Sequence, residues 1–189
     1  MFTNRFYDSA LIAIEEGGDT LYAADVDELT AKISTYTDYK PIVFCLCSNT
    51  VGALAGYISF IKNGWVPVML DARKDICMLQ NLIVCYHPMY IWEPSAIIQS
   101  LDGYSNMFSY KNYTLLRRDG GTYNIYKDLA LLLTTSGSTG SPKLVRLSYK
   151  NLQSNAESIA EYLNITSEER PITSLPMYYS YGLSVINSH

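Results

Sequence analysis

The sequence is poor in charge and in long apolar runs. Charged residues make up 17% of its 189 residues, and 14 Lys and Arg against 18 Asp and Glu give a net charge of −4. No cluster of Lys and Arg forms the basic stripe typical of nucleic-acid binding, so no nucleic-acid partner is expected. The longest apolar stretch, about Val51 to Ile61, is too short to cross a bilayer, so no membrane span is expected.

Signals of secretion or disorder are also scarce. The N-terminus lacks the apolar core of a signal peptide, and four cysteines are too few for a disulfide framework in a chain of this length. Eleven Gly and seven Pro fall short of a low-complexity composition, and 48% hydrophobic residues can build a core. The composition predicts a globular, cytoplasmic protein that forms one domain or a large piece of one.

Cysteine and histidine offer no recognisable metal site. The Cys45-x-Cys47 spacing fits no common zinc pattern, and we interpret both thiols as small buried hydrophobic groups. Of the two histidines, His87 is expected at the surface or in a cap. A position of His189 near a substrate is the less favoured interpretation of that residue. Without a Ser/His/Asp arrangement, a hydrolase is not predicted.

Apolar runs alternate with helical periodicity along most of the chain. The predicted strands are Thr20–Ala23, Pro41–Cys47, Val66–Leu70, Met89–Trp92, Leu129–Thr134 and Val145–Ser148, with a further strand region over Phe108–Arg118 and Tyr123–Tyr126 and a turn at Gly120-Gly121. The predicted helices are Asp25–Ser34, Val51–Ile61 with Gly64 after its end, Lys74–Cys85, Pro94–Leu101 and Tyr149–Leu163. This alternation predicts an α/β fold, with a mostly parallel sheet and helices on both faces.

The most informative segment follows the predicted strand Leu129–Thr134. From Thr135 to Pro142 every residue is glycine, proline or a small hydroxylated residue, and the segment ends in Lys143. Gly137 and Gly140 allow positive φ and a close approach of backbone N–H groups to a ligand, while hydroxyl groups and Lys143 add donors and positive charge. Because ligands bind at the carboxyl ends of parallel strands, we interpret this loop as a phosphate cradle.

Two alternatives to a phosphate cradle are a Walker A motif and a plain surface loop. A Walker A motif requires Gly directly before Lys and Ser or Thr directly after it, whereas Lys143 lies between Pro142 and Leu144. Runs of Ser, Gly and Thr are also common in surface loops, so composition alone leaves a plain loop open. The order of the residues is more specific than their composition.

Thr135 to Lys143 closely resembles the loop T-S-G-[ST]-T-G-x-P-K of the ANL superfamily of adenylate-forming enzymes, which includes acyl-CoA synthetases, luciferases and nonribosomal adenylation domains. Three further segments are similar to family segments in the same order. These are Ile42–Asp71, Leu147–Leu152 and Leu175–Leu183, the last resembling L-P-x-x-H-x-x-G-L. The resemblance implies that residues 1–189 are a partial N-terminal adenylation (AMP-binding) domain, the N-terminal portion of the large domain, truncated at its C-terminal end.

The resemblance also implies a reaction. ATP and a carboxylic acid would give an acyl-adenylate and pyrophosphate, and the acyl group would then pass to a thiol, either of CoA or of the phosphopantetheine arm of an acyl carrier protein. The full-length protein would be an acyl-adenylate-forming ligase, and the 189-residue piece would be inactive alone. Mg²⁺ would accompany ATP, with its ligands outside this chain. Acyl, aryl and aminoacyl substrates all remain open.

Residue roles follow from the same resemblance. Lys143 would neutralise charge in the transition state and is the predicted catalytic residue. The predicted nucleotide-binding residues are Thr135, Ser136, Gly137, Ser138, Thr139, Gly140 and Lys143, and the predicted substrate-binding residues are Tyr179 and Gly182. No metal ligand is predicted within the chain.

Three positions depart from the family pattern. Leu144 stands where Gly is usual, Tyr149 replaces a common His, and Tyr179 replaces the frequent His beside the carboxylate. Leu144 restricts the backbone after the loop, which favours an alternative function: a non-catalytic nucleotide- or phosphate-binding module that keeps the loop without the chemistry.

Overall fold

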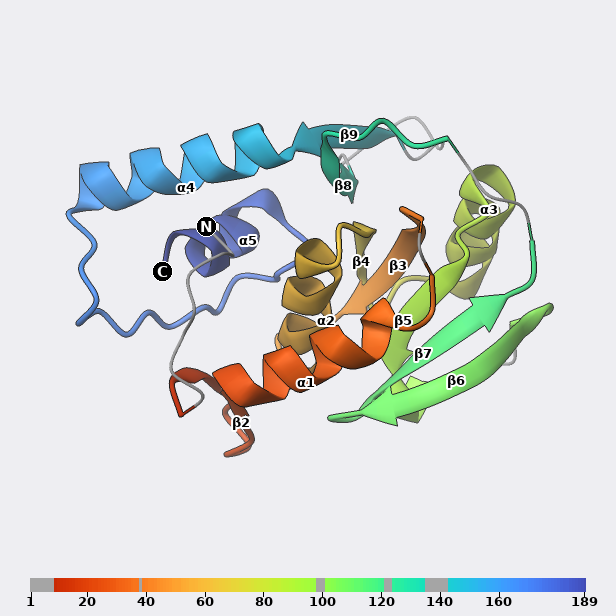
Figure 1. Ribbon diagram of the computed structural model, residues 1–189, viewed down its shortest axis with the longest axis horizontal. Helices are drawn as coiled ribbons and strands as arrows, with labels where there is room; N and C mark the ends of the chain where they lie inside the picture. The colour runs from red at the N-terminus through yellow and green to blue at the C-terminus, as the bar shows by residue number, and fades with distance from the viewer. Residues whose placement is uncertain (1–8, 38, 98–100, 121–123, 135–142) are drawn as a thin grey trace.

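The computed structural model describes residues 9–37, 39–97, 101–120, 124–134 and 143–189, which are built around a seven-stranded sheet of order β6-β7-β5-β3-β4-β8-β9 (Figure 1). Its strands are β3 (Ile42–Cys47), β4 (Val66–Asp71), β5 (Tyr90–Pro94), β6 (Tyr104–Tyr110), β7 (Tyr113–Arg118), β8 (Leu129–Thr134) and β9 (Leu144–Ser148). A separate antiparallel pair is formed by β1 (Leu11–Ile14) and β2 (Thr20–Tyr22). The helices are α1 (Ala23–Ser34), α2 (Val51–Lys62), α3 (Ile76–Tyr86), α4 (Tyr149–Leu163) and α5 (Ser180–Ser188), with a 3₁₀ turn η1 (Ser95–Ile97).

The predicted α/β fold is confirmed, and the sheet is mixed. Its centre, β5-β3-β4-β8, is parallel throughout, as expected from strands joined through helices. The edges are antiparallel, because β6 and β7 add to β5 on one side and β9 adds to β8 on the other. The parallel arrangement therefore applies to the strands that carry the centre of the fold.

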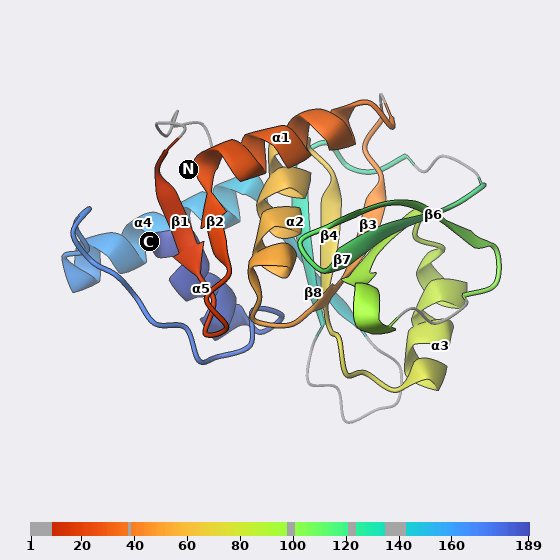
Figure 2. The same ribbon diagram turned by 90° about the horizontal axis from the view of Figure 1, so that it is seen from below.

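Helices cover both faces of the sheet. Alternate residues of β3 face opposite sides, so Val43 and Cys45 join the core shared with α1, α2, α4 and α5, whereas Phe44 and Leu46 join the core shared with α3. Figure 2 shows α1 and α2 on one side of the central strands and α3 on the other. Burial on both faces explains why the central strands read as continuous apolar runs.

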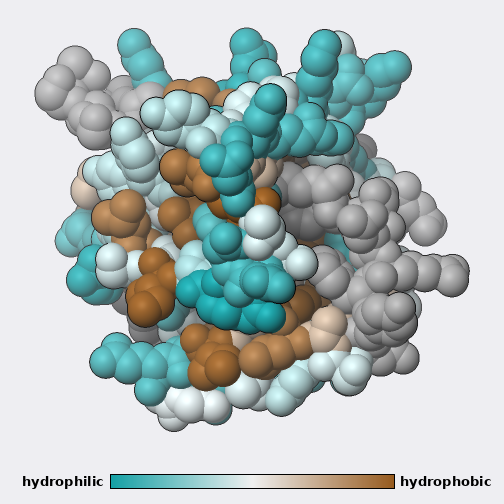
Figure 3. Space-filling model, turned by 90° about the vertical axis from the view of Figure 1, so that its left-hand side faces the viewer, coloured by the Kyte–Doolittle hydropathy of each residue, from teal (hydrophilic) through white to brown (hydrophobic). Residues whose placement is uncertain are grey.

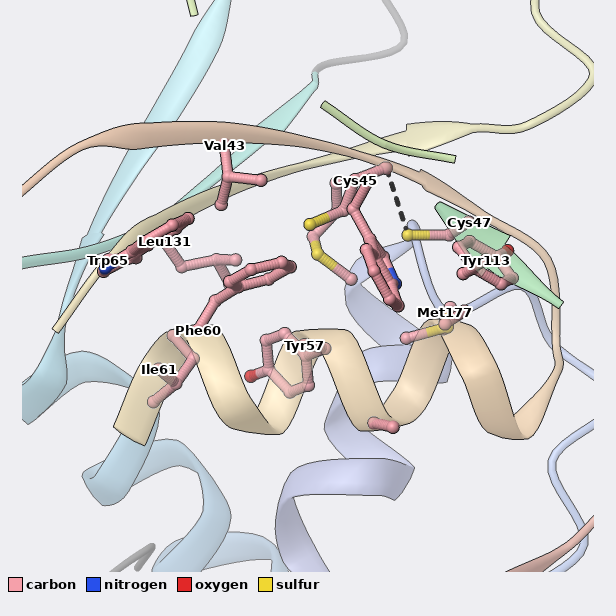
Figure 4. Close-up of a cluster of buried hydrophobic side chains, with 14 of the residues drawn as sticks. Val43, Cys45, Cys47, Tyr57, Phe60, Ile61, Trp65, Tyr113, Leu131 and Met177 are labelled. Atoms are coloured by element: carbon pink, nitrogen blue, oxygen red, sulfur yellow. Dashed lines mark hydrogen bonds between the residues drawn. The ribbon is translucent and has the colours of Figure 1, made fainter. Parts of the chain in front are cut away.

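The larger core is centred on α2, which is buried along most of its length. Trp65 stacks between Phe60 and Tyr90, with ring centroids 5.3 Å and 4.3 Å away (Phe60 and Trp65 in Figure 4). Gly64 has a φ of +72°, and the N–H of Trp65 donates to the carbonyl of Phe60 at 2.9 Å, which ends the helix where the sequence predicted. The chain thus turns directly from α2 into β4.

The predicted helix over Pro94–Leu101 is wrong in the part that the structure describes. Strand β5 continues through Pro94, where it pairs with Tyr113, and only the short turn Ser95–Ile97 follows. Residues 98–100 lie outside the described residues. Pairing with β7, which follows later in the chain, extends the strand beyond its apolar run.

The predicted strand region over Phe108–Arg118 is a hairpin of two strands. The chain turns at Lys111 and Asn112, which both have positive φ (41° and 62°), as two-residue hairpin turns require. The expected turn at Gly120-Gly121 is not this hairpin's turn, and Gly121 lies outside the described residues. Ile125 and Tyr126 are not in a strand.

Helix starts differ from the predicted ones by one or two residues where side chains cap them. Helix α1 begins at Ala23, so Asp25 lies in its first turn and accepts the N–H of Tyr22 at 2.9 Å instead of preceding the helix. Helix α3 begins at Ile76, and the carboxylate of Asp75 accepts the N–H of Cys77 at 2.9 Å. Among the described residues, no helix combines the length and hydrophobicity needed to span a membrane.

One carboxyl group is buried with an oxygen that has no hydrogen-bond partner among the described residues. Glu93 on β5 is 1% exposed, and its Oε1 accepts no hydrogen bond from the described residues. The hydroxyl of Thr114, directly across the strand pair, bonds instead to Ser95 at 2.8 Å and to Ser109 at 2.9 Å. Burial disfavours the charged form and raises the pKa of Glu93 to about 7.

We predict that Glu93→Gln stabilises the protein above neutral pH. A carboxyl group whose pKa rises from 4.5 to about 7 on folding contributes stability below pH 4.5 and loses it as the pH rises through 7, a loss of about 3 kcal/mol. The free energy of unfolding of the variant, relative to wild type, should therefore rise by about that amount between pH 4.5 and pH 8. Urea denaturation at both pH values measures it.

Glu168→Gln, which changes an exposed carboxylate, serves as the control and should leave the pH dependence of unfolding close to that of wild type. Equal pH dependence in wild type and Glu93→Gln would show that Glu93 does not titrate differently on folding.

Candidate functional site

Three parallel strands end at the same edge of the sheet. Strand β3 ends at Cys47, β4 at Asp71 and β8 at Thr134, and their parallel registers bring these carboxyl ends together. In open α/β sheets this edge is where ligands bind.

The predicted phosphate loop connects two paired strands at this edge. Thr134, the last residue of β8, pairs with Leu144, the first residue of β9, so Lys143 lies beside the carboxyl end of β8. Lys143 is exposed. The predicted nucleotide-binding residues Thr135, Ser136, Gly137, Ser138, Thr139 and Gly140 lie outside the described residues, and their roles stay predictions.

The unusual Leu144 has a structural role. It begins β9, and its partly buried side chain packs against the core that includes α3. The leucine therefore anchors the exit of the loop in the sheet. Tyr149, the other departure near the loop, is the first residue of α4, and Lys40 lies over its ring with Nζ 5.0 Å from the centroid.

A segment distant in sequence, Leu175–Tyr179, lies against the carboxyl edge. Asn49, in the turn after β3, accepts the N–H of Met177 at 3.0 Å through Oδ1. Its Nδ2 donates to the carbonyls of Leu175 at 2.8 Å and Thr173 at 3.3 Å. One side chain thus forms three hydrogen bonds to the backbone of this segment and its approach.

A second attachment comes from the end of β4. The hydroxyl of Tyr178 donates to Oδ2 of Asp71 at 2.9 Å, and Oδ1 of Asp71 accepts the backbone N–H of Arg73 at 2.9 Å. Burial raises the pKa of Asp71, but the hydrogen bonds from Arg73 and Tyr178 outweigh it, and the net result is a pKa below the usual value. Asp71 is therefore a carboxylate at neutral pH and accepts both bonds.

The two predicted substrate-binding residues differ in their surroundings. Tyr179 precedes α5 and is 53% exposed. Gly182 is buried in the first turn of α5, where a Cβ would lie 2.3 Å from the carbonyl oxygen of Pro176 and 2.7 Å from that of Leu175. Glycine is required there for close packing of the helix on the segment. A role of either residue in substrate binding stays a prediction.

The cysteines and histidines lie largely where the sequence predicted. Cys45 and Cys47 are buried, Cys47 donates to the carbonyl of Cys45 at 3.2 Å (Figure 4), and burial raises the pKa of Cys47 to about 12. His87 is exposed and caps the end of α3 in the left-handed conformation. His189 is exposed at the end of α5, with its Nδ1 3.1 Å from the carbonyl oxygen of Val185.

A hollow elsewhere lacks the chemistry of a polar-ligand site. It has a volume of about 400 Å³ and is lined by Ser158, Ile159, Tyr162 and Leu163 of α4. Helix α4 begins where β9 ends, so it starts at the edge of the sheet opposite to the carboxyl edge. Figure 3 shows scattered apolar patches, separated by hydrophilic side chains, on the face at this end of the molecule.

Sequence reasoning missed Asn49, Asp71 and Tyr178. Asn49 and Asp71 are polar residues placed at or just after the ends of apolar strand runs, and that placement was the available signal. Their partners lie more than a hundred residues away, because the bond between Asn49 and Met177 spans 128 positions and the bond between Asp71 and Tyr178 spans 107. Only the folded chain reveals these contacts.

Comparison with known proteins matches part of this chain to a family. The sequence model of the AMP-binding enzyme family matches residues 121–188. The 2-succinylbenzoate–CoA ligase of Bacillus velezensis is 39% identical over 64 residues, which are 34% of this chain and 13% of the ligase. Malformin synthetase mlfA of Aspergillus neoniger is 52% identical over 42 residues, which are 22% of this chain and 1% of the synthetase.

The fold has solved counterparts. The structure of ATP-bound MatB from Rhodopseudomonas palustris superposes with a TM-score of 0.72 at 20% identity, and the match covers 99% of this chain and 42% of MatB. This chain thus spans less than half the length of that protein, and the aligned segments are small parts of the curated relatives.

The structure is an α/β domain in which the segment Leu175–Tyr179 is hydrogen-bonded to the carboxyl edge of the sheet. Residues 121–188 match the AMP-binding enzyme family, in agreement with the resemblance of the chain to the ANL superfamily of adenylate-forming enzymes.

We predict that Gly182→Ala destabilises the protein by about 1–3 kcal/mol, because the added methyl group would press on backbone atoms that cannot move independently. Urea denaturation at constant pH measures the loss. Gly17→Ala is the matched control: a Cβ at Gly17 meets nothing within 4 Å, and its change should stay within about 0.5 kcal/mol. Equal stability of the two variants would contradict the packing role of Gly182.

Proposed function

We propose that this chain is the part of an acyl-adenylate-forming ligase that holds the phosphates of ATP and one side of the carboxylate site. The whole protein would join ATP and a carboxylic acid to an acyl-adenylate, release pyrophosphate and transfer the acyl group to a thiol. The observation that carries the proposal is the fold's placement of both ends of the glycine- and hydroxyl-rich loop, Thr134 and Lys143, at the carboxyl edge of the sheet.

The two sides of the proposed site come from different segments. The loop that ends at Lys143 would bind the β- and γ-phosphates, with Thr135, Ser136, Gly137, Ser138, Thr139 and Gly140 as donors and turn residues. Lys143 would neutralise the charge that develops as pyrophosphate leaves, an interaction strengthened in the transition state. Tyr179 and Gly182 would belong to the carboxylate side, beside the segment that Asn49 and Asp71 hold.

The cofactor would be ATP with Mg²⁺. The comparison structure of MatB is described as ATP-bound, which supports a nucleotide site in this fold. Mg²⁺ is usually held through substrate phosphates and one or two carboxylates. The described residues contain no group of three or more His, Cys, Asp or Glu placed to hold a metal ion. We propose that the ligands of this ion come from outside this chain.

Two thiol acceptors fit the proposal. The relative from B. velezensis is a CoA ligase, and a relative from Gibberella zeae is a nonribosomal peptide synthetase. The acceptor would therefore be CoA or the phosphopantetheine arm of an acyl carrier protein. The acid and the acceptor would be identified together, by assaying acyl, aryl and amino acids with each thiol.

We predict that Lys143→Ala lowers the rate of carboxylate-dependent ATP–pyrophosphate exchange on the order of 100-fold or more, because one preorganised positive charge at the transferring phosphate is lost. The assay uses the protein expressed from its complete reading frame, with a panel of carboxylic acids. Lys150→Ala, an exposed lysine on α4, is the matched control and should exchange at close to the wild-type rate.

The same assay tests the alternative of a non-catalytic binding module. A module would bind ATP without exchange in the wild type, and Lys143→Ala would then weaken ATP binding alone. Exchange at the full rate in Lys143→Ala would refute the role proposed for this lysine.

A further inference from the structure

The contacts that hold Leu175–Tyr179 are hydrogen bonds of the side chains of Asn49 and Asp71. They link the ends of two central strands to a segment without regular structure, and they lie outside the sheet ladders and helices. Asn49 is exposed, so water could satisfy its amide if the segment moved away. A hydrogen bond that competes with water adds little net stability, but it fixes the relative position of the groups it joins.

The turn that carries Asn49 is hydrogen-bonded to a buried tyrosine of the core. The N–H of Ser48 donates to the hydroxyl of Tyr113 at 3.1 Å, and that hydroxyl donates to the carbonyl of Leu46 at 3.0 Å. Tyr113 is 2% exposed and stacks on Trp92 at a centroid distance of 5.4 Å. The turn after β3 is therefore locked to the core.

The orientation of the Asn49 amide follows from its partners. Oδ1 faces the backbone N–H of Met177, and Nδ2 faces the backbone carbonyl of Leu175. A flipped amide would point donors at a donor and an acceptor at an acceptor, so one orientation satisfies the contacts. Asn49 thus bonds to both a donor and an acceptor of the segment, and these two bonds fix the position of Leu175–Tyr179 along the edge of the sheet.

Asp71 completes the attachment from the neighbouring strand. It is held by the backbone N–H of Arg73, and it receives the hydroxyl of Tyr178 at 2.9 Å. Beyond Tyr178 the segment joins α5, because the N–H of Leu183 donates to the carbonyl of Tyr179 at 2.9 Å. The exposed ring of Tyr179 thus leaves from a backbone that is held on both sides.

We infer that Asn49 and Asp71 are positioning residues for the carboxylate side of the adenylation site. They hold Leu175–Tyr179 against the carboxyl ends of β3 and β4, and through it they set the place of Tyr179. This inference rests on the proposed function. Asn49 and Asp71 would affect binding of the acid, but not binding of ATP, by holding the backbone that carries Tyr179.

The test separates the two substrates. Tyr178→Phe removes only the hydroxyl that binds Asp71, and Asn49→Asp keeps an acceptor for Met177 while losing both donors. In ATP–pyrophosphate exchange with the best acid of the panel, Tyr178→Phe should raise the KM for the acid about 3- to 10-fold, the equivalent of one hydrogen bond. Asn49→Asp, which loses two hydrogen bonds, should raise it by at least as much. The KM for ATP should change less than about twofold.

Tyr104→Phe is the matched control. Its hydroxyl donates to the carbonyl of Pro88 at 2.6 Å, just before the amino end of β5 and away from the carboxyl edge. This variant therefore also loses one tyrosine hydrogen bond. It should leave the KM for the acid at the wild-type value. Thermal unfolding of all variants is measured in parallel, to relate any change in KM to the loss of stability.

The outcomes are distinct. A raised KM for the acid in Tyr178→Phe and Asn49→Asp, with Tyr104→Phe unchanged, supports the inference. A fall in Tm without a change in the KM for the acid, or equal effects on both substrates, overturns it and leaves a structural contact. Absence of exchange in the wild type overturns the proposed function itself, and the inference with it.

Discussion

The parallel pairing of β3, β4 and β8 is the constraint on which the candidate site depends. Strand β4 pairs with β3 along its whole length, from Val66 to Asp71, and with β8 at Val68 and Met69. Both faces of these strands are buried, so a slip of one residue would exchange the side chains of the two cores. The register chosen by the cores also places Asp71, Asn49 and Lys143 along one edge. The polar edge is therefore a consequence of apolar packing.

The close approach of α2 to the sheet transmits that constraint to the edge. Two glycines make it possible: a Cβ at Gly56 would lie 2.2 Å from Nε1 of Trp92, and one at Gly52 would lie 2.2 Å from the carbonyl oxygen of Lys111. Nε1 of Trp92 instead donates to the carbonyl of Gly52 at 3.1 Å. Because the helix can rest directly on the strands, the turn from β3 into α2 is short, and it carries Asn49 at a fixed place.

Much of the fold could be predicted from the sequence, because the central strands and α2 are defined by local apolar pattern. Leu129–Thr134 was predicted with its observed bounds, and Gly64 ends α2 as expected. Errors gather where pairing between distant segments decides the structure. Pro94 continues β5 because β7 lies beside it, and the hairpin turns at Lys111 and Asn112, neither of which is glycine.

The same distinction applies to the two sides of the candidate site. The loop before Lys143 is one continuous segment, so its composition and order identify it in the sequence. The hydrogen bonds that hold Leu175–Tyr179 join Asn49 and Asp71 to partners more than a hundred positions away, so no local sequence pattern predicts them. Contacts of this second kind can change at one end without altering the loop. A nucleotide site encoded locally and an acid site assembled from distant segments would explain why the sequence predicts a phosphate loop but leaves the acid open.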